Sequence, residues 1–178
     1  MDSSNPALSG MVRAFNIPWD PVGDGLSGRL GWPLSCPNPQ RILVETRPDL
    51  FDASRPDETL DLVHAMIAVA HWHRFLVISA HAERMIAYYS DAETPRRIAE
   101  EIGMLSSAML AEDRAGMRED WIAGLSRVRY GLRPCGGIGP IGLEHWPLPN
   151  LWAGFRAGED GRIVPLPGLP SGPGAAAA

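Results

Sequence analysis

The chain has 178 residues, of which 45% are hydrophobic and 21% are charged, proportions typical of one globular domain with its own core. Its formal net charge of −5 excludes a global electrostatic attraction to nucleic acid or to anionic membranes. All 16 basic residues are arginine, which excludes Schiff-base and lysine general-base chemistry.

The N-terminal sequence and the cysteines bear on the cellular compartment. The first ten residues, MDSSNPALSG, have neither the basic nor the apolar region of a signal peptide. No apolar run approaches the roughly 18 residues of a membrane span. Cys36 and Cys135 are the only cysteines, and their wide separation does not fit a zinc motif. We therefore expect a cytoplasmic protein with reduced thiols and no membrane segment.

The first part of the chain predicts an irregular segment, then a strand and a helix. Residues 1–40 are rich in proline and glycine, which favour turns and irregular loop. Residues 41–45, RILVE, form an apolar, β-branched run typical of a buried strand. After a loop, Pro56 marks a helix start, and apolar residues at helical spacing extend this helix to about Trp72.

The second part of the chain predicts two more strands separated by helices. Residues 73–89 read as a buried strand that enters a helix through the junction Ser79–Ala82. Residues 94–129 have apolar positions at helical spacing and predict an inserted helical region. Residues 131–142, GLRPCGGIGPIG, predict a flexible loop, and residues 150–157 predict a last strand.

This order of elements defines a fold class and a domain organisation. Strands that alternate with helices predict an α/β fold with parallel strands joined by crossover connections. We expect an α/β domain at residues 41–160, preceded by the irregular segment 1–40. The proline- and glycine-rich residues 161–178 predict a disordered tail.

Asp49 and His81 are the candidate catalytic residues, because each follows a predicted strand at the end where α/β proteins usually bind ligands. Asp49 is suited to a general base or a metal ligand, although an aspartate there more often stabilises a turn. His81 is suited to proton transfer, although a lone histidine there is more often a hydrogen-bonded loop residue. Glu45 and Arg156 are further strand-end candidates.

Two other motifs are weaker indications of a functional site. His71 and His73 flank Trp72, but they fall at a predicted helix end, where the helix dipole alone favours histidine. The run GGIGPIG has no lysine and does not open a predicted helix, so it fails the P-loop pattern. No metal site is predicted.

Several phrases in order resemble one known family. The phrases are WDPV at residues 19–22, RILVETRPDLF at 41–51, the run from Pro56 to Gly103 that contains ERM, and WPLPNLWAGFRAGED at 146–160. They resemble segments of a phage and bacterial family of unknown function that is radical-SAM-like and has a three-cysteine motif. The resemblance implies a partial TIM-type (radical-SAM-like) barrel, a [4Fe–4S] cluster and S-adenosylmethionine as the radical source.

The sequence departs from that family where the chemistry would be. The cysteine-rich loop expected after WDPV is missing, and Cys36 matches no cluster position. The family's Thr-Lys-Arg-Pro junction before ERM is replaced by Ser-Ala-His-Ala, which removes two basic residues. We therefore predict no cofactor and expect a shortened, divergent relative that has kept the packing residues and lost the cluster ligands.

Three functions fit the sequence. The first is a non-catalytic binding or accessory protein of phage origin, which binds an unknown protein partner, a ligand or a second copy of itself. The second is an enzyme with altered chemistry that uses Asp49 and His81. The third is a nucleic-acid-associated accessory protein with an arginine stripe in the region 94–133, but interleaved carboxylates there favour a solvated, ion-paired face.

Overall fold

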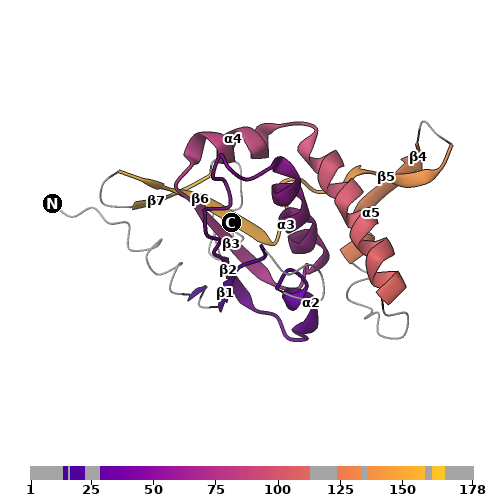
Figure 1. Ribbon diagram of the computed structural model, residues 1–178, viewed down its shortest axis with the longest axis horizontal. Coiled ribbons are helices and arrows are strands. Elements are labelled where there is room, and N and C mark those ends of the chain that lie inside the picture. The colour runs from indigo at the N-terminus through magenta and orange to yellow at the C-terminus, as the bar shows by residue number, and fades with distance from the viewer. Residues whose placement is uncertain are drawn as a thin grey trace, which may run out of the picture.

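A computed structural model describes residues 14–15, 17–22, 29–112, 124–133, 136–158 and 162–166 (Figure 1). Its elements in chain order are β1 (Ile17–Trp19), α2 (Trp32–Ser35), β2 (Arg41–Val44), α3 (Asp57–Val69), β3 (Arg74–Ser79), α4 (Ala82–Ser90), α5 (Thr94–Glu112), β4 (Val128–Leu132), β5 (Ile138–Leu143), β6 (Leu151–Ala157) and β7 (Arg162–Pro165).

The main sheet has five strands in the order β1-β2-β3-β6-β7. The first four are parallel, and their register aligns Val44 with Val77 and Val77 with Ala153. β7 runs antiparallel to β6 and ends the sheet. Because the four parallel strands point the same way, their carboxyl ends meet at one edge, which is where a ligand is expected.

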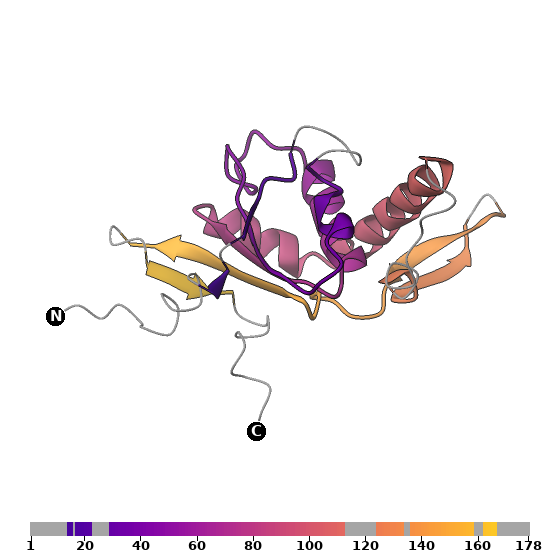
Figure 2. The ribbon, with the colours of Figure 1, turned by 90° about the horizontal axis from the view of Figure 1, so that it is seen from below.

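The helices cover one face of this sheet, as the view from below shows (Figure 2). Side chains alternate between the faces of a strand, so Phe75 and Val77 of β3 join the helices in the main core, whereas Leu76 points to the opposite face. On that opposite face Leu76 packs with Trp152 and with Phe15. The sheet therefore has helices on one face and a smaller apolar cluster on the other.

The predicted α/β class with parallel strands is confirmed, but the barrel part of the prediction is not. The five described strands form an open sheet, with β1 and β7 at its two edges. Within the described residues no strand closes this sheet on itself. The antiparallel direction of β7 is the physical reason, because a barrel of this type would continue from β6 with another parallel strand.

The region predicted to be a helical insertion and a flexible loop contains a β-hairpin. α5 ends at Glu112, residues 113–123 lie outside the described part, and β4 and β5 form a two-stranded antiparallel sheet. The glycines and prolines favoured a loop at the sequence level, yet they allow close packing here: a Cβ added at Gly103 of α5 would lie 3.0 Å from Cγ of Pro140 in β5. Packing against α5 thus outweighs local propensity.

Regular elements also occur near the two chain ends, in segments predicted to be irregular or disordered. β1 and α2 lie within the segment predicted to be irregular, and β7 lies within the predicted tail. Leu166 follows β7, is buried, and donates its backbone N–H to the Ala153 carbonyl. Residues 1–13, 23–28 and 167–178 lie outside the described residues.

A buried polar network joins α3, α4 and α5. His64 contacts the Leu60 carbonyl through Nδ1 and the Tyr89 hydroxyl through Nε2, both at 2.7 Å. Because a carbonyl can only accept, Nδ1 carries the proton and the Tyr89 hydroxyl donates to Nε2. Burial lowers the pKa of His64 to about 4, so the ring is neutral near pH 7.

The second half of this network is an ion pair between helices. The Tyr88 hydroxyl donates to Asp61 at 2.8 Å, and Arg97 contacts the same carboxylate at 2.9 Å. Desolvation raises the pKa of Asp61, and the hydrogen bonds from Tyr88 and Arg97 oppose that shift. Arg97 also pairs with Asp91 at 2.7 Å. These bonds fix the start of α5 against α3. None of the described helices has the length and apolar character needed to cross a membrane.

Candidate functional site

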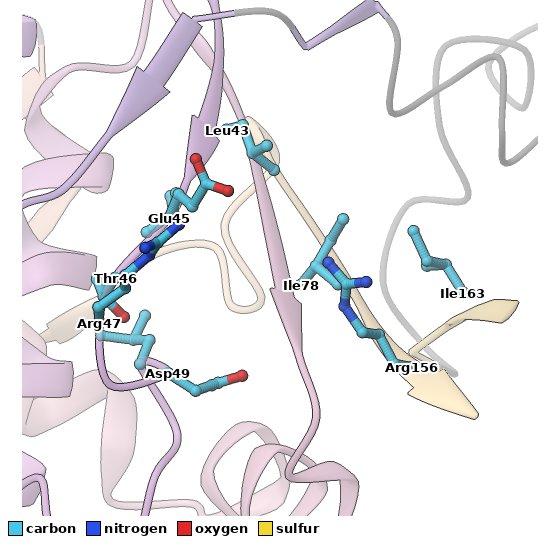
Figure 3. Close-up of a pocket in the computed structure, with 10 residues that line it drawn as sticks. Leu43, Glu45, Thr46, Arg47, Asp49, Ile78, Arg156 and Ile163 are labelled. Atoms are coloured by element: carbon cyan, nitrogen blue, oxygen red, sulfur yellow. The ribbon is translucent and has the colours of Figure 1, made fainter. Parts of the chain in front are cut away.

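A hollow of about 300 Å³ lies at the carboxyl ends of β2, β3 and β6 (Figure 3). This volume is at the lower end of the range for small-molecule sites. The residues that line it are Leu43, Val44, Glu45, Thr46, Arg47, Asp49, Leu50, Ile78, Arg156 and Ile163. The sheet edge therefore brings Asp49 together with Glu45 and Arg156, the two further strand-end candidates from the sequence. Within the described residues, His81 does not line this hollow.

Asp49 bridges the loop after β2 to the end of β3. Its Oδ1 accepts hydrogen bonds from the Ser79 hydroxyl at 2.8 Å and from the Phe51 N–H at 2.9 Å, and its Oδ2 accepts from the Ala80 N–H at 2.9 Å. Three donors thus occupy one carboxylate, and the Ser79 side chain is buried. This arrangement fixes the loop in place and leaves Asp49 poorly suited to take a proton from a ligand.

His81 faces a different carboxylate. It is the residue before α4, and its Nε2 lies 3.5 Å from Oδ2 of Asp52, with 42% of the His81 side chain exposed. Its backbone N–H donates to the Ser79 hydroxyl at 2.9 Å. Hydrogen bonds from Ser54 hold the pKa of Asp52 below its usual value, and His81 adds a smaller lowering. Asp49 and His81 are therefore linked through Ser79, but their side chains have different partners.

Two arginines hold the loop that carries Asp49. Arg55 donates to the Pro48 carbonyl at 2.7 Å and to the Asp49 carbonyl at 3.2 Å. Arg84, the arginine of the ERM phrase, donates to the carbonyls of Asp52 and Arg55 and to the Asp57 carboxylate. The ERM arginine thus has a structural role in this chain, because it ties α4 to the β2–α3 loop.

Four polar side chains at the hollow have no hydrogen bond or ion pair to another described residue. Glu45, Arg47 and Arg156 are exposed, and none has a side-chain hydrogen bond or ion pair to another described residue. The Thr46 hydroxyl oxygen is buried and has no hydrogen-bond partner among the described residues. A buried hydroxyl without a partner is uncommon in a folded protein. Arg47 and Thr46 were missed from the sequence, although their position directly after a strand was a usable signal.

The donor set for an iron–sulfur cluster is incomplete. Such a cluster needs at least three thiolates for radical chemistry of the expected kind, and the chain has two cysteines, of which Cys135 lies outside the described residues. Among the described residues, no group of three His, Cys, Asp or Glu side chains is arranged to hold a metal ion. The residues present therefore do not fit the cluster that the resemblance implies.

The His-Trp-His motif is structural. His73 is buried; its Nδ1 accepts from the Gln40 N–H at 3.0 Å, and its Nε2 contacts the Pro33 carbonyl at 2.8 Å. His71 contacts the Val69 carbonyl at 3.2 Å through Nδ1. The two rings thus have separate backbone partners.

Of the five described arginines in the proposed stripe, Arg96 and Arg97 are ion-paired, whereas Arg127, Arg129 and Arg133 have no ion pair to another described residue. Arg96 pairs with Glu93 at 2.8 Å and with Glu100 at 2.9 Å, and Arg97 pairs with two aspartates, as described above. Arg114 and Arg118 lie outside the described residues. The ion pairs of Arg96 and Arg97 disfavour contact of these two side chains with a phosphate backbone.

Comparison with known proteins gives a match to a protein family. A family model described as "Protein of unknown function (DUF5131)" matches residues 14–164. This range includes the whole of the main sheet except the last residue of β7, and it includes every residue that lines the hollow. No curated protein and no solved structure matches the chain.

Proposed function

The chain belongs to the family of proteins of unknown function DUF5131, and we propose that it is a binding or accessory protein that holds a small ligand with an anionic group at the strand-end hollow. One observation carries the proposal: the guanidinium groups of Arg47 and Arg156 lie at the hollow without a partner among the described residues. The carboxyl edge of parallel strands is also where this class of fold binds ligands.

The remaining lining residues define the ligand further. Guanidinium groups bind carboxylates and phosphates through paired hydrogen bonds. The free carboxylate of Glu45 favours an amine or a hydroxyl on the same ligand, and Thr46 offers a buried hydroxyl. Leu43 and Ile78 provide an apolar wall (Figure 3). A small ligand with both an anionic group and a donor group fits this lining best.

We also propose that the sheet is the retained part of a radical-SAM-like barrel that has lost its cluster chemistry. The sequential order of the parallel strands β1, β2, β3 and β6 supports this, as do the helices on one face. The number of cysteines supports the loss of the cluster. A phage origin remains an expectation from the resemblance, and the cytoplasmic location remains a prediction.

The enzymatic alternative with Asp49 and His81 draws less support from this geometry. Asp49 already accepts three hydrogen bonds, and His81 faces Asp52 outside the hollow. The pair stays a prediction of the sequence, and a catalytic role would need the Asp49 bridge to open.

The test of ligand binding is a thermal-shift and calorimetric titration with two probes, inorganic phosphate and S-adenosylmethionine. We expect saturable binding of at least one probe to the wild-type chain and at least a tenfold loss of affinity in Arg156→Ala. Arg41→Ala is the matched control, because Arg41 is exposed and lies at the opposite end of β2. Equal loss in both variants, or no binding of either probe at millimolar concentration, would contradict the proposal.

The test of the lost chemistry is anaerobic reconstitution with iron and sulfide. We expect no stoichiometric iron on the purified chain after removal of excess reagents. An intact cluster on the chain alone would show that other ligands replace the missing thiolates, and the non-radical function would then be wrong.

A further inference from the structure

The β4–β5 hairpin has an edge that no other described strand pairs with. The hairpin is a separate two-stranded sheet at the end of the molecule opposite β7 (Figures 1 and 2). The Glu144 N–H donates to the Arg127 carbonyl, and the Arg133 N–H donates to the Gly137 carbonyl. These bonds flank β4 and show that the backbone N–H and C=O groups of its odd-numbered residues point toward β5. The backbone groups of Val128, Tyr130 and Leu132 therefore point outward, away from β5.

The exposed apolar side chains of the described residues gather at this end. Tyr130 is 53% exposed, Leu132 is 78% exposed and Ile138 is 80% exposed. Of the large hydrophobic side chains that are exposed in the described part, only Ile86 lies away from α5 and the hairpin. Exposed apolar side chains beside an open strand edge mark an interaction surface. A two-stranded hairpin also gains stability when further strands extend it.

The edges of the main sheet lack this property. β1 has three residues and contains Pro18, and β7 has four residues and ends in Pro165. Proline lacks a backbone donor, and short edge strands with proline resist pairing with another chain. β4 has five residues, Val-Arg-Tyr-Gly-Leu, and contains no proline. Among the described strands, β4 is thus the edge strand best suited to pair with another chain.

We propose that β4 pairs antiparallel with β4 of a second copy of this chain, which makes a four-stranded sheet across a two-fold axis at Tyr130. In this register Tyr130 lies opposite Tyr130 of the second copy, and Val128 lies opposite the second copy's Leu132. All of these residues direct their backbone groups outward, as an antiparallel ladder requires. Aromatic and aliphatic cross-strand pairs stabilise such a ladder.

The charges of β4 are compatible with this self-pairing. Arg129, the one charged residue of β4, lies opposite Gly131 of the second copy, so no like charges face each other within the strand. The flanking pair of Arg127 and the second copy's Arg133 falls outside the strand. The Arg133 side chain lies over Gly139 of its own hairpin, where an added Cβ would be 2.0 Å from Nε, and so on the β5 side. Within the strand, self-pairing therefore places no arginine directly opposite another arginine.

The test measures the molar mass of the full chain by light scattering and sedimentation at concentrations from about 1 to 100 µM. We expect the wild-type mass to rise from 19.3 kDa toward twice that value. Tyr130→Lys places two cations opposite each other, and we expect it to remain a monomer with an unchanged circular dichroism spectrum. Ile86→Lys is the matched control and should still dimerise, because Ile86 is an exposed apolar residue on α4, away from the hairpin.

A charge-exchange experiment tests the register. Tyr130→Glu alone should be monomeric, and an equimolar mixture of Tyr130→Glu with Tyr130→Lys should regain the dimer mass, because the opposed charges now attract. A wild-type monomer at 100 µM would overturn the proposal. A Tyr130→Lys dimer, or failure of the mixture to associate, would overturn the register. Ligand binding at the strand-end hollow is measured separately and does not depend on this result.

Discussion

Protonation of His64 should link the stability of the protein to pH. His64 is fully buried, and its pKa falls from 6.5 to about 4 because burial penalises the charged ring. In the unfolded chain the pKa returns to 6.5, so between these values the unfolded state binds more protons than the folded state. Stability therefore rises with pH in this window: it is complete above pH 6.5 and is lost as pH falls toward 4.

The size of this effect follows from the two pKa values. From pH 7 to pH 5 the His64 contribution lowers the free energy of unfolding by about 2 kcal/mol, and by pH 4 the loss reaches about 3 kcal/mol. The full shift applies because the ring has no exposure to water. Other groups titrate in the same range, among them Asp61, whose pKa is raised by burial. A comparison with a variant is therefore needed to isolate His64.

The informative variant is the double substitution His64→Phe with Tyr89→Phe. It removes both partners of the 2.7 Å hydrogen bond, so no buried hydroxyl is left unsatisfied. Urea denaturation of both proteins at pH 7, 6, 5 and 4 gives the free energy of unfolding at each pH. We expect the wild type to lose about 2 kcal/mol more than the double variant between pH 7 and pH 5. Parallel pH profiles for the two proteins would refute the reasoning.

Four substitutions test the packing of the described structure, each by urea denaturation. Asp49→Ala leaves three donors without an acceptor and should lower the free energy of unfolding by about 2–3 kcal/mol. Glu45→Ala is its control, because it removes an unpaired exposed carboxylate and should change stability by less than about 0.5 kcal/mol. Equal effects of the two substitutions would argue against the Asp49 bridge. Phe51→Ala removes a fully buried ring and should cost about 3–5 kcal/mol, and a cost under 1 kcal/mol would be inconsistent with the described core. Gly124→Ala should cost about 1–3 kcal/mol because its Cβ would lie 2.5 Å from the Val69 carbonyl oxygen, and a neutral result would show that this approach is looser.

The buried strands and the long helix after the first of them could be predicted because hydrophobic pattern alone determines them. The run at residues 41–45 corresponds to β2, the run within residues 73–89 contains β3, and the last predicted strand corresponds to β6. Each of these is buried on both faces or nearly so, which gives a continuous apolar signal.

The hairpin and β7 could not be predicted because their residues carry no such signal. β5 reads Ile-Gly-Pro-Ile-Gly-Leu, in which glycine and proline favour a turn when only local preference is considered. Contact with α5 supplies the stabilisation that local preference lacks, since Pro140 packs against Gly103. β7 similarly depends on pairing with β6, and neither contact is visible from neighbours in the sequence.

The position of the candidate site could be predicted from the sequence, but the hydrogen-bond partners of its side chains could not. The end of a strand located Asp49, but only the fold shows that its carboxylate is occupied by donors from β3 and from its own loop. His81 has the same strand-end position, yet its place at the start of α4 turns it toward Asp52. Arg47 and Thr46 were overlooked because neither residue type is unusual in a loop.

Most of the hollow is encoded by one short stretch of chain. Seven of its ten lining residues fall between Leu43 and Leu50, so a single eight-residue segment supplies most of the lining. The Asp49 bridge ties this segment to the end of β3, and Arg55 holds it through the Pro48 and Asp49 carbonyls. Under the proposed function, changes in this segment would alter ligand preference while the scaffold stays constant. An exchange of residues 43–50 between two members should transfer preference as a unit.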